Sequence, residues 1–469
     1  MLTHHVRLLS APDSARPTRI VILGGGFAGL ATARELERLL PDDGSVRITL
    51  VNRENFFLFT PMLHEVAASD LDVTHIVNPL RKLVRRTTLF IGTVDAVDTV
   101  AQRVRVSHAD GTHAHELPYD HLVIALGAVT NFFDIPGLAE RAITMKSLGD
   151  AIQLRNRLIK HLEEADFECA SDVRAPLLTV VVAGGGFAGV ETVAAIHDFL
   201  YEALRFYRNL TPEDVRVILV HPGAVILPEL GEPLGRYTQD RLAERGVEVA
   251  VNTRVTRLTD DGVALSDGRM IAARTIVWTA GTSANPVLET IPCGKERGRV
   301  TVDEFLAVPD LPNVWALGDC AVIKDPVTGK SYPPTAQHAL REGRRAAANI
   351  VATLRGQPMR PFSFSTIGLL AATGRRTGVA NIFGVNFSGF VAWWLWRTIY
   401  LAKLPRMEKK VRVALDWTLD LVFSKDLVQF GTWRAPAISQ RESGGVMTAF
   451  RMVPELEPRM DARVPAVDP

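Results

Sequence analysis

The sequence predicts an α/β protein with two Rossmann-like dinucleotide-binding domains, followed by a C-terminal region of amphipathic helices. Two glycine-rich turns carry this prediction: residues 20–30 read IVILGGGFAGL, and residues 179–196 read TVVVAGGGFAGVETVAAI. Each turn follows an apolar strand pattern and precedes a helical one, which is the context in which G-x-G-x-x-G binds a dinucleotide. Two such turns indicate one nucleotide that is held permanently and one that comes and goes.

The three glycines of each turn have different roles. The first lets the strand bend sharply into the helix, the second lets the backbone approach a pyrophosphate, and the third lets the helix pack against the strand. Because helix-end N–H groups then face the phosphates, we expect nucleotide contacts at Gly24, Gly26, Gly29, Gly184, Gly186 and Gly189.

Length, charge and cysteine content exclude several classes of protein. A chain of 469 residues is long enough for about three units. The 53 Lys and Arg residues balance 52 Asp and Glu residues, so no nucleic-acid partner is expected. The cysteines at 169, 293 and 320 are too few and scattered for a disulfide framework or a metal site, and they favour a reducing compartment. Residues 1–18 lack the apolar core of a secretory signal and are expected to be a flexible lead-in.

An aromatic-rich segment follows the first βαβ unit and carries a family resemblance. Residues 53–68 read RENFFLFTPMLHEVAA. Together with the first glycine turn, this segment resembles the type II NADH:quinone oxidoreductases, which are single-chain flavoproteins. The resemblance extends over roughly residues 19–430. It implies a non-covalent FAD, contacted by Gly24, Gly26, Phe27, Ala28, Gly29, Asn52, Arg53, Thr60, Pro61, Val94, Ala125, Gly127, Asp319 and Gln337.

The resemblance implies that the second glycine turn binds NADH. The implied contacts are Gly184, Gly186, Gly189, Glu191, His221 and Gly281. At the ends of the strands that follow the two turns, where an acid usually binds a ribose, the chain has Asn52 and His221. Asn52 accepts hydrogen bonds without a charge, whereas His221 neither binds a ribose as an acid does nor repels a 2′-phosphate. NADPH therefore stays open beside NADH as the substrate.

Two residues are the candidates for catalysis. Glu191 follows the third glycine of the second turn, where an acid can complement the helix dipole. The resemblance instead implies a place near the nicotinamide and the flavin, with a part in substrate binding or proton relay. The second candidate is Gln337, in residues 332–343, YPPTAQHALREG, which resemble the family's AQxAxQxG segment at the quinone end of the flavin.

Other residues are implied to lie around the flavin and the acceptor. The Gly318-Asp319 pair in residues 311–323 resembles the family's third flavin motif, and a buried Asp there needs a ligand partner. The implied quinone-side residues are Gln337, His338 and Arg341. Arg341 stands where the family has a second glutamine, and a guanidinium there can bind a quinone oxygen or an anionic headgroup, or narrow the tunnel.

The C-terminal composition predicts a surface element rather than a membrane span. Residues 377–396 carry no charge, but three glycines interrupt them. We expect a short apolar helix over residues 390–404 and an amphipathic one over residues 409–430, with Arg412, Asp416, Asp420 and Ser424 opposite Val411, Leu415, Leu419 and Val422. Such helices lie on a bilayer or on a partner chain, with Lys403, Arg406, Lys409 and Lys410 near headgroups. The resemblance implies peripheral association with the cytoplasmic face of the cell membrane, or an inner membrane, and a homodimer.

These observations give a domain division and a function. The expected divisions are a flexible N-terminus (1–18), an FAD-binding domain (19–147 and 282–360), an NAD(P)H-binding domain (148–281), a membrane-associating and dimerisation region (361–434) and a disordered tail (435–469). The resemblance implies an NAD(P)H:quinone oxidoreductase that pumps no protons and moves a hydride to flavin and two electrons to a membrane quinone. The alternatives are a sulfide:quinone oxidoreductase, which needs redox cysteines near the flavin, and a non-catalytic nucleotide-binding flavoprotein, which His221 and Arg341 favour.

Overall fold

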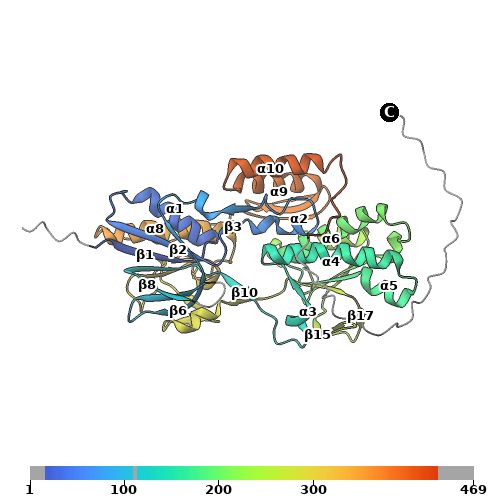
Figure 1. The fold of residues 1–469 in the computed structure, drawn as a ribbon, viewed down its shortest axis with the longest axis horizontal. Coiled ribbons are helices and arrows are strands. Elements are labelled where there is room, and N and C mark those ends of the chain that lie inside the picture. Colours follow the sequence, from blue (N-terminus) through green and yellow to red (C-terminus); the bar gives the residue numbers. More distant parts are fainter. Residues whose placement is uncertain (1–15, 109–112, 431–469) are drawn as a thin grey trace, which may run out of the picture. The chain divides into compact units, whose positions relative to one another are not determined.

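Two five-stranded parallel sheets form the centre of the fold (Figure 1). The computed structural model describes residues 16–108 and 113–430, so the expectations for residues 1–15 and for the tail from 435 lie outside the described residues. The first sheet has the order β22 (Val314–Ala316), β9 (His121–Ile124), β1 (Thr18–Leu23), β2 (Val46–Asn52) and β5 (Thr88–Ile91). The second has the order β11 (Ile143–Thr144), β18 (Thr275–Trp278), β12 (Thr179–Ala183), β13 (Arg216–Val220) and β14 (Val247–Ala250).

The two halves share one local plan. In the first, β1 leads through the glycine turn into α1 (Phe27–Leu39), and in the second, β12 leads into α6 (Phe187–Ala203). The central strands are buried because their β-branched and leucine side chains pack against α1 or α6 on one face and against a small antiparallel sheet on the other. The α/β fold predicted from the two glycine turns is confirmed.

Distant segments complete the first sheet. Strand β22 pairs with β9, although nearly two hundred residues separate them in the chain. Helix α8 (Ala336–Leu354) packs against α1, and the two helices approach closely at Gly343, where an added Cβ would lie 2.4 Å from the carbonyl oxygen of Ala28. Residues 89–119 include the expected antiparallel insertion, formed by β6 (Thr93–Asp98), β7 (Arg103–Ser107) and β8 (Ala114–Pro118).

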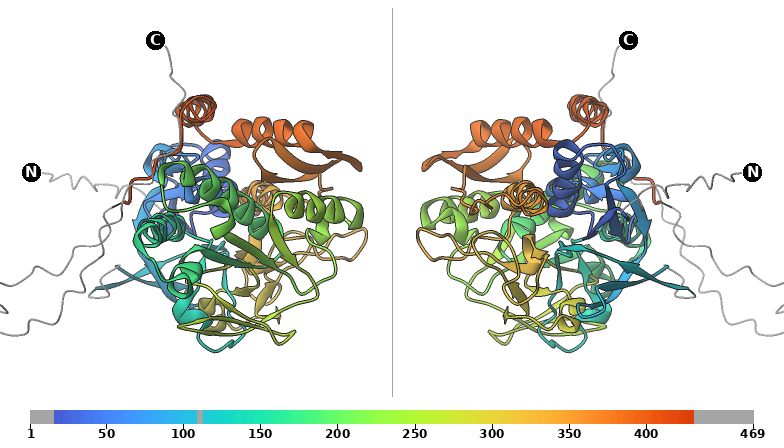
Figure 2. Two further views of the ribbon diagram at one scale, coloured as in Figure 1. Left: turned by 90° about the vertical axis from the view of Figure 1, so that its right-hand side faces the viewer. Right: turned by 90° about the vertical axis from the view of Figure 1, so that its left-hand side faces the viewer.

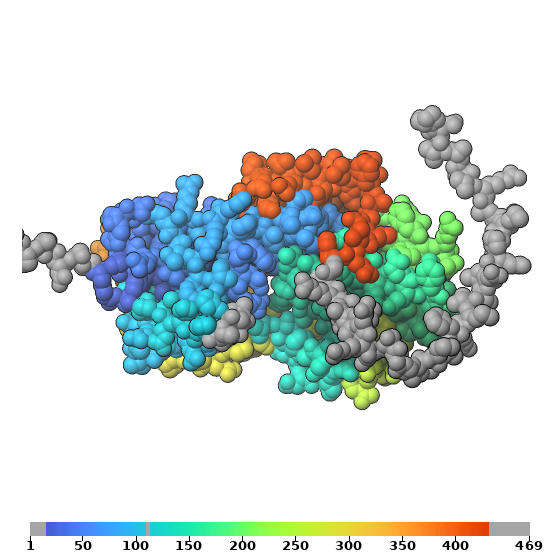
Figure 3. All heavy atoms as spheres, viewed as in Figure 1, coloured from blue at the N-terminus to red at the C-terminus, as the bar shows by residue number. Residues whose placement is uncertain are grey.

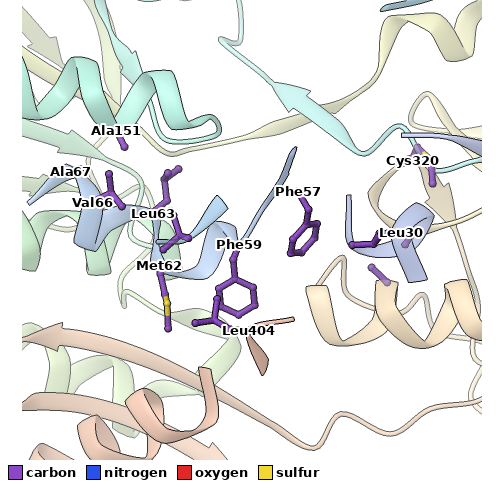
Figure 4. Close-up of a cluster of buried hydrophobic side chains, with 14 of the residues drawn as sticks. Leu30, Phe57, Phe59, Met62, Leu63, Val66, Ala67, Ala151, Cys320 and Leu404 are labelled. Atoms are coloured by element: carbon purple, nitrogen blue, oxygen red, sulfur yellow. The ribbon is translucent and has the colours of Figure 1, made fainter. Parts of the chain in front are cut away.

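The aromatic segment is tied to the first glycine turn by its rings. It forms β3 (Phe56–Leu58), a 3-10 turn η1 (Thr60–Met62) and the short helix α2 (Leu63–Ala67). The Phe27 ring makes edge contacts with Phe57 and Phe59, with centroids 5.0 and 6.0 Å apart. Phe59 and Met62 also lie beside Leu404 in the apolar cluster of Figure 4.

The C-terminal region forms a small antiparallel sheet covered by one helix, with a second helix packed against the first. The sheet contains β24 (Gly368–Gly374), β25 (Thr377–Ile382) and β26 (Val385–Ser388), and the helices are α9 (Gly389–Lys403) and α10 (Met407–Leu419). Strand β24 packs against α6, and α9 packs against β24 and β25 (Figure 2). Within the ranges that the structure describes, no helix is long and apolar enough to cross a membrane.

Three expectations for α10 are wrong. The helix ends at Leu419 and does not continue to residue 430. Lys409, expected near headgroups, is buried, and its Nζ donates to the carbonyl oxygen of Thr74 at 2.6 Å. Asp416 on the expected polar stripe also faces protein, because its carboxylate pairs with His75. Polar side chains that the helical pattern alone assigns to solvent are therefore paired with protein groups from distant parts of the chain.

We predict that Gly343→Ala lowers the stability of the fold. The added methyl group would overlap Ala28 and push α8 away from α1, at a cost of about 1–3 kcal/mol, as is typical of overpacking. Thermal unfolding measures the loss. Gly149→Ala in α4 (Leu148–Phe167) is the matched control, because its Cβ would have ordinary contacts and alanine favours a helix. Equal stability of the two variants would contradict the close contact of α1 and α8.

Candidate functional site

The first glycine turn is shaped to take a phosphate group. Gly24 has a φ of +102°, and a Cβ there would lie 2.2 Å from the carbonyl oxygen of Ala125. A Cβ on Gly29 would lie 1.8 Å from the carbonyl oxygen of Gly24, so α1 can start only with glycine at this position. At Gly26, by contrast, no atom lies within 4 Å of the Cβ position. The start of α1 is therefore open to a pyrophosphate, and the residues present fit an FAD.

The second glycine turn repeats this geometry. Gly184 has a φ of +117°, a Cβ on Gly189 would lie 1.7 Å from the carbonyl oxygen of Gly184, and Gly186 is open. The Oγ1 of Thr279, after β18, donates to the carbonyl oxygen of Ala183 at 2.9 Å and closes the far side of the turn. The N-terminus of α6 therefore carries the same open glycine turn, or glycine cradle, as the N-terminus of α1.

The unusual strand-end residues both hold their own glycine turns. Asn52 Oδ1 accepts a hydrogen bond from the Gly25 N–H at 2.8 Å, and its Nδ2 donates to the carbonyl oxygen of Glu54 at 2.7 Å. His221 Nδ1 accepts from the Gly185 N–H at 3.1 Å. Burial lowers the pKa of His221, which keeps the ring neutral and Nδ1 free to accept. Neither side chain brings a charge to the site.

The third flavin motif lies at the end of β22. Residues 318–320 form a 3-10 turn, and the Gly318 N–H donates to Glu342 Oε2 of α8 at 2.8 Å. Burial raises the pKa of Asp319, and no protein group in the described ranges donates to its carboxylate, which leaves this group for a ligand. Burial also raises the pKa of Glu342, to about 7. Sequence reasoning missed Glu342, whose only signal is its place one residue before the glycine of the AQHALREG segment.

Cys320 next to this motif is a structural thiol. It is buried, and its Sγ donates to the carbonyl oxygen of Leu317 at 3.0 Å. Burial raises the pKa of the thiol to about 11, so it stays protonated. All three cysteines are free, and Cys169 is exposed.

The remaining residues implied for the two nucleotides lie in turns and strands around the glycine cradles. Gly127 has a φ of +67° and an open Cβ position, and Gly281 has a φ of +76° with the Phe133 ring beside it. Arg53 is largely exposed and pairs with Glu54 at 3.4 Å. The others take up these positions: Ala28 and Phe27 in α1, Thr60 and Pro61 in η1, Val94 in β6, and Ala125 after β9.

The helix dipole does not explain why an acidic residue occupies position 191. Helix α6 begins at Phe187, so Glu191 lies beyond the first turn, where the dipole has little effect. Its Oε1 accepts hydrogen bonds from Trp396 Nε1 at 2.9 Å and from the Ala372 N–H at 3.2 Å, and its Oε2 lies 3.7 Å from His64 Nδ1. Burial raises the pKa of Glu191 to about 8, against the opposing effect of these two donors. The carboxyl group is therefore protonated near neutral pH.

One strand touches both candidate catalytic residues. Gln337 Nε2 donates to the carbonyl oxygen of Gly368 at the start of β24, at 3.2 Å. Ala372, which donates to Glu191, is four residues further along this strand. At the usual rise of a strand, the two contact points are about 13 Å apart. The structure thus brings Gln337 and Glu191 to the same edge of the C-terminal sheet.

His338 and Arg341 are held by protein groups. His338 is buried, its Nδ1 lies 2.7 Å from Thr335 Oγ1, and its ring packs near Tyr332 and Phe364. Arg341 donates to the carbonyl oxygen of Gln337 at 2.8 Å and stacks over the Phe364 ring at 4.0 Å. This arrangement gives both residues a role in holding the segment that carries Gln337.

Sequence reasoning missed the residues that surround Glu191. His64 and Glu65 come from α2, and Trp396 and Trp417 come from α9 and α10. Trp417 Nε1 donates to Glu65 Oε1 at 3.0 Å. The donors of these bonds lie 205 and 352 positions from their acceptors along the chain, so no local spacing signals them.

Comparisons with known families agree with this geometry. The family model described as pyridine nucleotide-disulphide oxidoreductase matches residues 18–343, and the NDH2 C-terminal domain matches residues 367–426. Over 426 residues the chain is 33% identical to the type II NADH:quinone oxidoreductase Ndh of Mycobacterium tuberculosis, with 87% of this chain and 89% of the relative covered. It is 32% identical to the demethylphylloquinone reductase NdbB of Synechocystis, with 86% and 96% covered.

The fold is also similar to a solved structure. The NDH2 of Plasmodium falciparum in complex with NADH has a TM-score of 0.82 at 20% identity, with 88% of this chain and 100% of that chain covered. This likeness concerns the fold, and the sequence matches carry the family assignment. The chain belongs to the type II NADH:quinone oxidoreductases, which are FAD-dependent oxidoreductases within the pyridine nucleotide-disulphide oxidoreductase family.

Proposed function

We propose that this chain oxidises NADH and reduces a quinone through a bound FAD, on a membrane surface and without pumping protons. Family membership supports the reaction class. The observation that carries the proposal is the shared contact of Gln337 and Glu191 with β24. Strand β24 thereby fixes both Gln337, proposed to shape the acceptor site, and the protonated carboxyl group of Glu191.

The proposed contacts follow the two glycine cradles. The first turn, with Asn52, Arg53, Thr60, Pro61, Val94, Ala125, Gly127 and Asp319, would hold the FAD, which supplies two-electron transfer between the donor and the acceptor when bound. The second turn, with Glu191, His221 and Gly281, would hold the nicotinamide nucleotide. We retain the domain division at residues 147/148 and 281/282 as part of this proposal, with Gln337, His338 and Arg341 on the quinone side.

The alternative of sulfide oxidation has little support from the cysteines. That chemistry needs cysteines that ionise near the flavin, whereas Cys320 is buried and protonated and Cys169 is exposed. The alternative of a non-catalytic flavoprotein relied on His221 and Arg341. Both have packing roles that are compatible with catalysis, because His221 supports its glycine turn and Arg341 supports Gln337.

An exposed apolar surface on α9 and α10 supports peripheral membrane association. These helices, coloured orange to red in Figure 3, carry large apolar side chains that are at least half exposed: Phe390, Val391, Trp394, Met407, Val411, Leu415 and Leu419. Several large apolar side chains exposed on two neighbouring helices are typical of a membrane or protein contact. We assign it to a bilayer, on the cytoplasmic face of the cell membrane or on an inner membrane. A homodimer through the same surface is the competing use.

Anaerobic stopped-flow mixing tests the reaction and the choice of nucleotide. We predict that both NADH and NADPH bleach the flavin, because the neutral His221 does not repel a 2′-phosphate. His221→Glu should keep the bond from Gly185 and lower the rate with NADPH about tenfold or more relative to NADH, through charge repulsion.

His221→Gln is the matched control, because it retains an acceptor without a charge. Its preference between the two nucleotides should equal that of the parent protein. Absence of flavin bleaching by either nucleotide in the parent protein, or bleaching by sulfide instead, would contradict the proposed function.

The raised pKa of Glu191 predicts a pH dependence. Its carboxyl group carries a proton below pH about 8 and loses it above, so the rate of quinone reduction should fall as the pH rises through this value. Glu191→Gln should reduce the rate by about tenfold to hundredfold and remove this inflection. Steady-state rates between pH 6 and 9 measure both effects.

Trp396→Phe is the diagnostic variant for this assignment. The Trp396 N–H stabilises the ionised form of Glu191 and lowers its pKa, so its loss should move the inflection to higher pH. An inflection that stays in place in both variants belongs to another group.

Vesicle binding tests the apolar surface. The double change Val411→Glu and Leu415→Glu should weaken co-sedimentation with vesicles of phosphatidylcholine and phosphatidylglycerol about tenfold or more, since it places two charges in the apolar contact. Val100→Glu, at an exposed apolar residue far from α9 and α10 in sequence, is the control and should bind as the parent does. Dissociation of a dimer with unchanged vesicle binding would assign the surface to a second copy of the chain.

A further inference from the structure

A cavity lined by many charged residues lies behind Glu191 and follows one face of α6. Its volume is about 190 Å³, and its lining includes Glu191, Ala195, Asp198, Glu202 and Arg205. These residues are spaced so that they share one face of the helix, and Glu191 is about 16 Å from Glu202 at the usual helical rise. The far side of the cavity is formed by α2, by the middle of α9 and by the segment after α10.

The outer end of this cavity reaches solvent. Glu202 Oε1 accepts from the Lys425 N–H at 3.0 Å, and Glu202 Oε2 lies 3.6 Å from Arg375, whose side chain is half exposed. Asp198 pairs with Arg245 and accepts from the Arg375 N–H at 2.8 Å. Charged groups therefore line this cavity from its outer end to the buried carboxyl group of Glu191.

The charges of the cavity fit water better than a charged ligand. Five basic side chains face six acidic ones, namely Glu65, Asp70, Glu191, Asp198, Glu202 and Asp420. Several are already paired; the buried Lys425, for example, lies 2.7 Å from Asp70. The basic and acidic side chains nearly balance, so neither an anion nor a cation is strongly favoured, and the described residues contain no group of metal-ligating side chains. A polar space of this size has room for several water molecules.

Glu65 stands inside the cavity with one oxygen free. Its Oε1 accepts from Trp417, whereas its Oε2 is buried and has no hydrogen-bond partner among the described residues. Burial raises the pKa of Glu65 to about 8, and the negative charge of Glu65 adds to the burial that raises the pKa of Glu191. Two neighbouring carboxyl groups that hold protons near neutral pH thus lie along one polar space.

The proposed reaction needs a proton from solvent. A quinone takes up two electrons and two protons to become a quinol, and the hydride from NADH supplies two electrons with one proton. The balance is NADH + H⁺ + quinone → NAD⁺ + quinol, so each turnover draws one proton from water. Glu191 is buried, so a proton that this group gives up must be replaced through the protein.

We propose that the cavity along α6 is this route and that Glu65 relays the proton from solvent to Glu191. Glu191 Oε1 is occupied by two N–H donors, so the proton resides on Oε2, on the side of His64. The 3.7 Å between Oε2 and His64 Nδ1 is too long for a direct hydrogen bond, and water in the cavity joins the carboxyl groups instead. When Glu191 gives up its proton, Glu65 passes its own proton to Glu191. Glu65 then takes up a new proton from solvent along the part of the cavity that contains Asp198 and Glu202. This assignment rests on the proposed quinone reduction.

Glu65→Gln tests the relay. Glutamine retains an oxygen for Trp417 but cannot carry a proton through the cavity, so quinone reduction should slow about tenfold or more. Bleaching of the flavin by NADH should be unchanged, and so should the reduction of ferricyanide, which takes up electrons without protons. The solvent deuterium isotope effect on quinone reduction should increase.

Two further variants keep the test independent of a folding defect. Ala195→Leu narrows the cavity without changing any titratable group, and it should also slow quinone reduction but not ferricyanide reduction. Glu163→Gln changes a carboxyl group outside the cavity, which is bonded to Tyr207, and should have no such effect. Flavin content and thermal unfolding report on the folding of each variant.

The outcomes separate the two proposals. Equal rates of quinone reduction in Glu65→Gln, Ala195→Leu and the parent protein would overturn the route, as would an equal slowing with quinone and ferricyanide. Failure of the parent protein to reduce any quinone, despite bleaching by NADH, would instead contradict the proposed function.

Discussion

Glu191 Oε1 joins parts of the chain that are far apart in sequence. It accepts hydrogen bonds from Trp396 on α9 and from Ala372 on β24, while its own helix starts at the second glycine turn. A buried carboxyl group without hydrogen-bond partners would be costly. The two N–H donors, together with the proton that Glu191 keeps near neutral pH, stabilise the carboxyl group in this buried place. The C-terminal region is therefore part of the site as well as a surface element, since it closes the space around Glu191.

Local spacing explains which parts were predictable. The glycine turns, the flanking strands and the helix over residues 390–404 depend on patterns within about twenty residues, and the structure has them close to the expected bounds. The packing of Phe27 on Phe57 and Phe59 also links two motifs that carried the resemblance. The sequence could therefore predict the fold and the place of both nucleotide cradles.

The residues around Glu191 depend on contacts that no short pattern records. His64, Glu65 and Trp396 lie in segments whose own periodicity indicates only a helix, and each gains its role from a distant element. The amphipathic pattern also misjudged α10, because His75 and Thr74 take Asp416 and Lys409 as partners. The place of Glu191 beyond the first helical turn follows from the start of α6 at Phe187, which the glycine spacing does not fix.

The pairing of each strand-end side chain with a glycine N–H has an evolutionary consequence. Asn52 and His221 differ in size and chemistry, yet each offers one acceptor atom to the backbone N–H of the glycine between the first two motif glycines, Gly25 or Gly185. What the backbone requires at this position is thus a lone pair, and the charge is left free to vary. A lineage can exchange Asp, Glu, Asn or His there without rebuilding the turn, so preference between nucleotides can drift while the architecture persists.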